Sequence, residues 1–245
     1  MTLLVINPNT TEGVTRRLVD AVRSEAGRGR EVQGITARFG ARYISCEASH
    51  AIAGHAVLDA WAAHCAAHGE PEAVLIGCFG DPGLWALRER SAAPVVGLAE
   101  AAMREAAALG RFAIVTGGAA WGPMLRRLAL ALGLDQALAR LEIIAPNGAA
   151  LAAEPRSAID LLRAACVSAA AAGDVHSVVL GGAGLAGMAP EVAHGLGVPL
   201  IDSVAAAARA LVGSERTAQV AERRPRPAAD PWVGLSPELA TALGG

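Results

Sequence analysis

A single cysteine follows a short apolar run in the stretch AVLIGCFGDPGL, residues 73–84. The run itself, residues 73–76, is typical of a strand buried in a parallel sheet, and ligands bind just beyond the carboxyl ends of such strands. Residues 81–83 are expected to open a helix, whose N-terminus would lower the pKa of a neighbouring thiol. Cys78 is therefore the first candidate functional residue, as a thiol that should ionise readily.

A second stretch, VVLGGAGLAGM at residues 178–188, has the same form. Its alignment with the first stretch places Gly182 at the position of Cys78. An upstream pair of apolar runs, residues 3–6 and 112–115, matches with nearly the same offset, and each run leads into a polar or glycine-rich loop. The near-constant offset predicts two similar halves that face each other across a cleft.

The elements needed to position these loops follow from the apolar pattern. Strands are predicted where short apolar runs occur, and helices where apolar residues recur on one face. The two kinds alternate along the chain, which is typical of an α/β protein with parallel sheets. Residues 202–212 are expected to form the last clear helix. Residues 223–227 interrupt regular structure, and we expect the tail to wrap the domain or to contact a neighbouring subunit.

Composition excludes several classes of protein. Hydrophobic residues make up 53% of the 245 residues, and many are alanines, as in close-packed helices. No segment reaches the roughly 18 consecutive apolar residues of a membrane-spanning helix, and the N-terminus lacks the pattern of a signal peptide. We therefore expect a cytoplasmic protein without a membrane partner.

Net charge, aromatic content and cysteine spacing indicate which partners and which thiol chemistry to expect. The net charge is −2 and aromatic residues make up 3% of the chain, so it has neither the charge nor the stacking platform expected of a nucleic-acid-binding protein. The four cysteines show no CxxC pairing, and we expect reduced thiols. They are Cys46, Cys65, Cys78 and Cys166.

Seven stretches, in this order along the chain, resemble the aspartate/glutamate/hydantoin racemase superfamily, and most closely its hydantoin and allantoin racemase branch. They are INPNTT at 6–11, AIAGHAVLDA at 51–60, CFGDPGL at 78–84, VVGLAEA at 95–101, FAIVTGGAAWGPML at 112–125, LGGAGLAGM at 180–188 and PLIDSVAAA at 199–207.

This resemblance implies an α/β fold of two pseudo-symmetric Rossmann-like (flavodoxin-like) lobes, with parallel sheets and an active-site cleft between the lobes. Residues 1–98 with about 203–245 would form the N-terminal lobe, and residues 99–202 the C-terminal lobe. It also implies a small-molecule substrate, no metal, pyridoxal or nucleotide cofactor, and a homo-oligomer.

In the racemases of this superfamily two cysteines flank the substrate carbon, and one removes a proton while the other returns one to the opposite face. Cys78 matches the first of these positions, and Gly182 matches the second. Glycine has no titratable side chain and cannot act as a general acid or base. This departure leaves the reaction open.

Three kinds of chemistry remain, together with one function that is not catalytic. The chain could be a racemase in which water, a histidine or another polar residue acts opposite Cys78. It could instead resemble the single-cysteine arylmalonate decarboxylases, or it could hydrolyse a cyclic amide, imide or amidine through nucleophilic attack by Cys78. A bilobal protein that only binds a small molecule is the remaining alternative.

The resemblance also suggests which groups hold the substrate. Asn9 and Thr10 would bind a carboxylate or ring carbonyl from one lobe, and Thr116 and Gly117 would do so from the other. Gly182 would shape the pocket. Basic residues are scarce near the motifs, which argues against phosphorylated substrates. Backbone amides would stabilise the enolate-like charge; they belong to Phe79, Gly80, Ala183 and Gly184.

Overall fold

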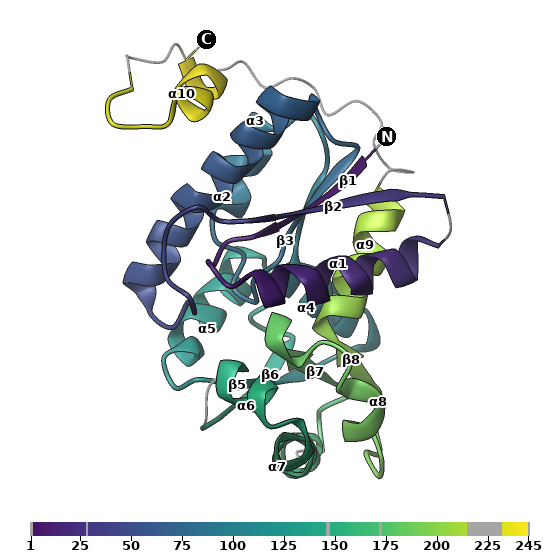
Figure 1. Cartoon of the computed structure of the whole chain (residues 1–245). Coiled ribbons are helices and arrows are strands. Elements are labelled where there is room, and N and C mark those ends of the chain that lie inside the picture. The colour runs from purple at the N-terminus through teal and green to yellow at the C-terminus, as the bar shows by residue number, and fades with distance from the viewer. Residues whose placement is uncertain (1, 28, 146–147, 172, 215–231, 245) are drawn as a thin grey trace.

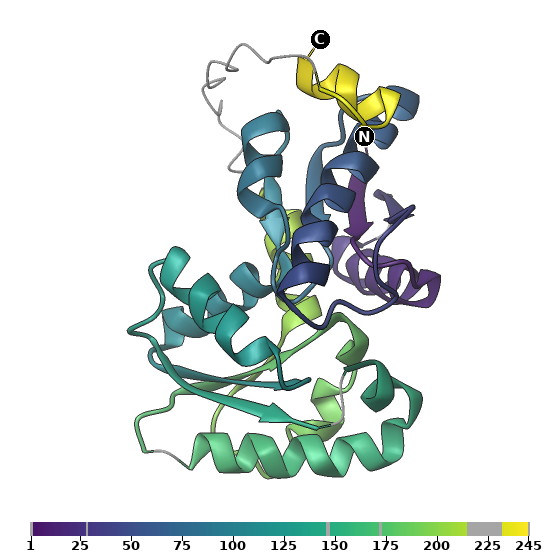
Figure 2. The same cartoon turned by 90° about the vertical axis from the view of Figure 1, so that its left-hand side faces the viewer.

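The computed structural model describes residues 2–27, 29–145, 148–171, 173–214 and 232–244. Within these ranges the chain forms two four-stranded parallel sheets, one above the other in Figures 1 and 2. The first sheet has the order β2-β1-β3-β4, and the second has the order β6-β5-β7-β8. The repeated strand order confirms the two similar halves predicted from the sequence.

The strands of the first sheet alternate with helices, as the apolar pattern predicts. These elements are β1 (Thr2–Asn7), α1 (Glu12–Ala26), β2 (Glu31–Thr36), α2 (Glu47–His68), β3 (Ala73–Ile76), α3 (Leu84–Arg90) and β4 (Val95–Gly97).

The second sheet repeats the alternation, with additional short helices. Its elements are α4 (Leu98–Leu109), β5 (Phe112–Gly117), α5 (Trp121–Ala131), β6 (Leu138–Ile144), α6 (Gly148–Ala153), α7 (Pro155–Ala170), β7 (Ser177–Gly181), the 3₁₀ turn η1 (Ala183–Leu185), α8 (Ala189–Val192) and β8 (Leu200–Asp202). Two helices follow, α9 (Ser203–Ser214) and α10 (Pro237–Gly244).

Alternate residues of each strand enter different parts of the core, because successive side chains of a strand point to opposite faces. Leu3 and Leu75 face a central cluster that also contains Phe112 of the second sheet. Leu4 and Val74, on the other face, pack against α2, α3 and α10. Since α1, α4, α5 and α9 all contribute to the central cluster, the two sheets share one continuous core.

The chain returns to the first sheet after completing the second. Helix α9 follows β8, yet it packs against α1, α4, β3 and β4. This supports the assignment of α9 to the N-terminal lobe, while the lobe boundaries at residues 98 and about 203 stay a prediction.

The end of the chain forms a helix that the sequence analysis missed. Helix α10 packs against α2 (Figure 1), and its Leu239 is buried there. Ser236 donates to the Asp59 carboxylate at 2.6 Å, beside the ion pair of Asp59 with Arg38. The described end of the tail therefore wraps the N-terminal lobe, as one of the two predictions had it, whereas residues 223–227 lie outside the described ranges.

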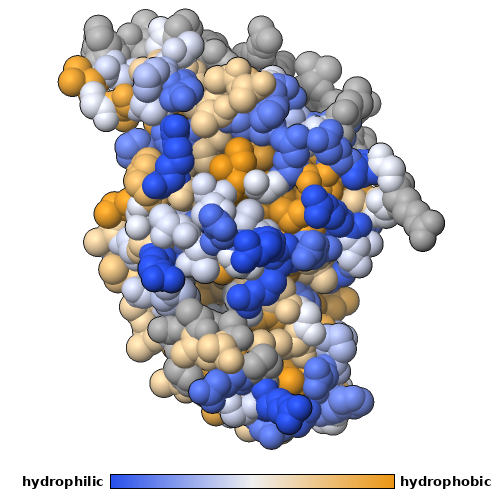
Figure 3. All heavy atoms as spheres, viewed as in Figure 1, coloured by the Kyte–Doolittle hydropathy of each residue, from blue (hydrophilic) through white to orange (hydrophobic). Residues whose placement is uncertain are grey.

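No helix in the described ranges combines the length and hydropathy that crossing a membrane requires. Figure 3 shows hydrophilic side chains gathered across the middle of the viewed face, in the region of α1.

Candidate active site

The central strands of both sheets end around one cavity of about 200 Å³. The loops after β1 and β3 approach it from the first sheet, and those after β5 and β7 approach from the second. Its size suits a small ligand, since pockets for drug-sized molecules are typically about 300–1,000 Å³. The residues that line it are Asn9, Thr11, Val14, Arg17, Arg42, Tyr43, Ile44, Gly77, Cys78, Phe79, Thr116, Gly117, Trp121, Gly181, Gly182, Ala183 and Gly184.

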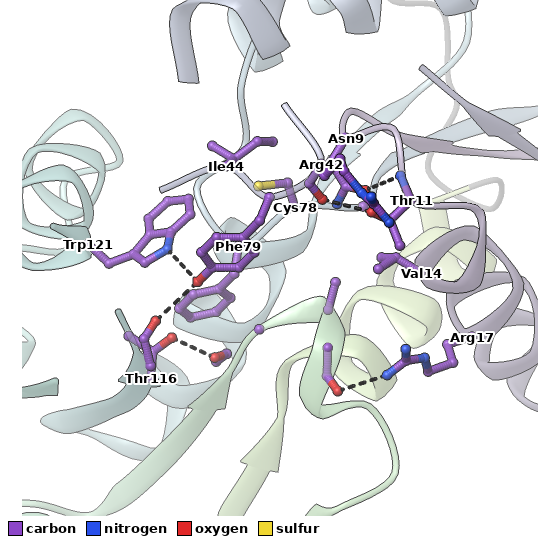
Figure 4. A pocket seen from close by; sticks show the side chains of 17 residues that line it. Asn9, Thr11, Val14, Arg17, Arg42, Ile44, Cys78, Phe79, Thr116 and Trp121 are labelled. Carbon is purple, nitrogen blue, oxygen red and sulfur yellow. Dashed lines mark hydrogen bonds between the residues drawn. The ribbon is translucent and has the colours of Figure 1, made fainter. Parts of the chain in front are cut away.

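Cys78 lies on the wall of this cavity and is 7% exposed. Figure 4 shows it with Phe79 in the middle of the site, with Trp121 to one side and Arg42 to the other. Its backbone N–H donates to the carbonyl of Ile76 at 3.0 Å, which fixes the thiol directly at the end of β3.

The sequence-based expectation of an easily ionised thiol was wrong. Burial, and after it the negative charge of Asp81, raise the pKa of Cys78 well above its ordinary value. The expected helix N-terminus is not beside the thiol, because residues 81–83 form a turn and α3 begins only at Leu84. Burial and the charge of Asp81 both disfavour the thiolate form of Cys78.

A buried carboxylate anchors the turn that carries Cys78. Asp81 is 1% exposed and has φ of 50°, a left-handed conformation that is uncommon outside glycine. Its carboxylate accepts hydrogen bonds from the backbone N–H groups of Ala99 and Glu100, at 2.9 and 2.7 Å. Burial nevertheless raises the pKa of Asp81 to about 7. The cysteine turn is thus tied to the first turn of α4.

The loop after β1 is held rigid by two asparagines. The Asn7 amide nitrogen donates to the Asn9 side-chain oxygen at 3.1 Å, and the same oxygen accepts from the backbone of Thr11 at 2.9 Å. That oxygen is committed to the loop, so Asn9 can offer a ligand only its amide N–H groups.

Gly182 occupies the position in the second half of the chain that corresponds to Cys78 in the first half. Its φ is 141°, which side chains rarely tolerate, and its N–H donates to the Ser203 hydroxyl at 3.1 Å. Thr116 pairs with Gly181 across the sheet, and its hydroxyl donates to the Gly181 carbonyl at 2.7 Å. The wall opposite Cys78 is thus mainly backbone.

Two arginines on the cavity wall overturn the expectation that basic residues are scarce here. Arg17 and Arg42 line the cavity, and no carboxylate is among the described lining residues. The Arg17 guanidinium donates to the carbonyl of Gly184 at 3.4 Å, which links α1 to the loop after β7. The site therefore favours anionic or electron-rich groups.

Eight of the ten predicted site residues line the cavity, although their roles stay predictions. They are Asn9, Cys78, Phe79, Thr116, Gly117, Gly182, Ala183 and Gly184.

The other two, Thr10 and Gly80, lie outside the lining. The Thr10 amide is directed to the carbonyl of Ala41 at 3.1 Å. The Gly80 amide, proposed for the enolate, donates to the Cys78 carbonyl at 2.8 Å, and its own carbonyl accepts from His50 Nε2 at 2.9 Å. Gly80 thus supports the cysteine turn.

Sequence reasoning missed the contribution of the loop between β2 and α2. Arg42, Tyr43 and Ile44 reach the cavity from this loop, and Trp121 reaches it from the start of α5. No local pattern marks these residues, because contacts between distant segments bring them to the site.

Comparison with known proteins places these features in a family context. A family model described as Asp/Glu/Hydantoin racemase matches residues 3–211. The hydantoin racemase of Paenarthrobacter aurescens is 32% identical, over 85% of this chain and 89% of that protein.

Two solved structures are also similar. The allantoin racemase of Klebsiella pneumoniae has 34% identity and a TM-score of 0.81, with 89% of this chain and 88% of that one covered. The allantoin racemase of Pseudomonas fluorescens has 28% identity and a TM-score of 0.84, with 94% of this chain and 99% of that one covered.

Proposed function

The chain belongs to the Asp/Glu/hydantoin racemase family, and we propose that it is a cofactor-independent racemase that inverts the carbon next to a carbonyl in a hydantoin-like ring or a small amino-acid derivative. The observation that carries this proposal is the position of Cys78, at a strand end in a cavity enclosed by loops from both sheets. A thiol in that place can reach one face of a small ring.

The proposed chemistry is a proton transfer at the substrate carbon. The Cys78 thiolate takes the proton, and the electron pair of the C–H bond moves into the neighbouring carbonyl as an enolate. Reprotonation on the opposite face gives the mirror-image product. Arg17 and Arg42 line the same cavity and supply positive charge that favours the enolate over its neutral form.

The two ends of the cavity suggest how the substrate lies. Trp121 provides apolar, aromatic surface at one end, whereas Arg42 and Thr11 lie at the other (Figure 4). Carbonyl or carboxylate oxygens of the substrate would therefore point toward the arginines, and its apolar substituent toward Trp121.

One observation favours a second candidate, decarboxylation by a single cysteine. Gly182 supplies no second thiol, and the raised pKa of Cys78 keeps the thiol protonated and ready to donate. In that reaction the bond to the carboxylate breaks, CO2 leaves, and the resulting enolate takes the Cys78 proton. A hydrolase or a binding protein would use the same cavity without proton transfer at carbon.

NMR in D2O separates these functions. Wild type, Cys78→Ala and the exposed-cysteine control Cys46→Ala would be incubated with 5-substituted hydantoins, allantoin, aspartate, glutamate and arylmalonates. The proposal expects deuterium at the substrate carbon with loss of optical activity, abolished by Cys78→Ala and retained in Cys46→Ala. Release of CO2 or a ring-opened product without racemisation would replace the proposal with the decarboxylase or the hydrolase, and thermal shifts without turnover would leave a binding protein.

A further inference from the structure

Tyr43 carries a titratable group to the part of the cavity where the second thiol is missing. It lies on the loop between β2 and α2 in the first half of the chain, and it lines the same cavity as Cys78. Its hydroxyl donates to the carbonyl of Gly117 at 3.4 Å and accepts a hydrogen bond from Trp121 Nε1 at 3.3 Å. The phenol therefore reaches across to the edge of the second sheet.

The register of that sheet relates Gly117, which the hydroxyl contacts, to Gly182. Thr116 of β5 is paired with Gly181 of β7, so Gly117, the last residue of β5, and Gly182 each follow one member of this pair. Neighbouring strands are about 4.8 Å apart. The hydroxyl therefore contacts a residue of β5 that adjoins, across the strand pair, the position that matches Cys78.

We propose that Tyr43 is the second proton-transfer residue of the racemisation, in the place of the missing cysteine. The inference rests on the proposed function. In one direction the Cys78 thiolate takes the C–H proton, and the Tyr43 O–H gives its proton to the opposite face of the enolate, which leaves a neutral thiol and a phenolate. In the other direction the phenolate takes the proton and the Cys78 thiol returns one.

The other hydroxyl groups at the site are less suited to this role. Thr116 donates to the Gly181 carbonyl and Thr11 donates to the Arg42 carbonyl, and both are aliphatic alcohols, which ionise far less readily than phenols. The Tyr43 oxygen accepts a hydrogen bond from Trp121 Nε1 at 3.3 Å while its O–H donates to the Gly117 carbonyl. Tyr43 can thus both give and accept a proton.

Separate enantiomers of 5-isobutylhydantoin in D2O provide the test for wild type and Tyr43→Phe. With Tyr43 removed, the enantiomer whose proton faces Cys78 should still exchange deuterium with retained configuration, while inversion falls by about 100-fold or more. Equal loss of exchange and inversion, or unchanged inversion, would overturn the inference alone. Absence of Cys78-dependent exchange in the wild type would overturn the proposed function and this inference with it.

A second measurement avoids the loss of the side chain. Tyr43 is the one tyrosine in the sequence, so growth on 3-fluorotyrosine alters this position alone. Fluorine makes the phenol more acidic with little change in shape. The pH profile of racemisation should shift toward lower pH, whereas a profile that superimposes on that of the unlabelled protein would overturn the inference.

Discussion

The backbone N–H of Asp81 donates to the carbonyl of Cys78 at 3.1 Å, so the thiol and the buried carboxylate belong to one turn. After burial, the charge of Asp81 is the second cause of the raised pKa of Cys78. The same carboxylate accepts the first N–H groups of α4. Asp81 therefore both positions the thiol and opposes its ionisation.

Asp81→Asn should make Cys78 more reactive toward iodoacetamide. The substitution removes the negative charge while burial persists, so the pKa of the thiol falls and the thiolate fraction rises by roughly tenfold for each pKa unit. Peptide mass spectrometry after timed alkylation would measure Cys78 and the exposed Cys46 in the same sample. Cys46 should react at an unchanged rate, and an equally unchanged rate at Cys78 would contradict the assigned effect of the charge.

The Asp81 carboxyl should also make stability depend on pH. Its pKa in the folded protein, about 7, lies above the ordinary value, so the folded state holds the proton more tightly than the unfolded state. This contribution is complete at low pH and is lost as pH rises through about 7. The quantity to compare is the free energy of unfolding of the wild type minus that of Asp81→Asn. It should fall by on the order of a few kcal/mol between about pH 4 and about pH 8.

Urea unfolding at both pH values would measure that difference, and the other carboxyl groups cancel between the two proteins. A difference that increases with pH would instead mean that the hydrogen bonds from Ala99 and Glu100 outweigh the burial of Asp81.

Gly182→Ala should destabilise the fold by about 1–3 kcal/mol, because its φ of 141° is costly for a residue with a Cβ atom. Space does not cause this cost, since an added Cβ would lie 3.6 Å from its nearest neighbour, Leu185 Cγ. Gly213→Ala is the matched control: it lies in α9 with open space, and it should stabilise by about 0.5–1 kcal/mol. Urea unfolding of both variants checks the contrast, and a neutral Gly182→Ala would show that the backbone relaxes there.

Arg17→Gln should weaken the binding of substrates that carry a carboxylate. Its guanidinium lines the cavity and links α1 to Gly184, so we expect KM to rise by about 3- to 10-fold for a 5-carboxymethylhydantoin and less for a neutral 5-alkylhydantoin. Arg16→Gln is the control, because Arg16 is the exposed neighbour that pairs with Glu12. Equal changes in KM for the two substrates would contradict a charge-specific role.

The repeat, the parallel sheets and eight of the seventeen lining residues could be predicted because they follow from local patterns. Short apolar runs mark the central strands. Residues at or just after the carboxyl ends of these strands line the cavity, as Thr116 and Cys78 do. Topology then brings the carboxyl ends of these strands together.

The features that the sequence analysis did not predict depend on contacts between distant segments, which local patterns do not encode. Tyr43 reaches Gly117 only because the loop after β2 spans the cavity. The thiol pKa was mispredicted because it depends on burial and on the orientation of Asp81. Thr10 and Gly80 lie outside the lining because one-residue differences within a turn decide which groups face the cavity.

The packing of α9 has a consequence for synthesis on the ribosome. All four strands of the first sheet have been translated once β4 is complete, yet Leu3 and Leu75 share their core cluster with α9, which begins at Ser203. A nascent chain at that stage exposes an apolar face that its own later residues will cover. The N-terminal half is therefore completed only after the C-terminal half has emerged, and exposed apolar surface of this kind makes a folding intermediate prone to aggregation.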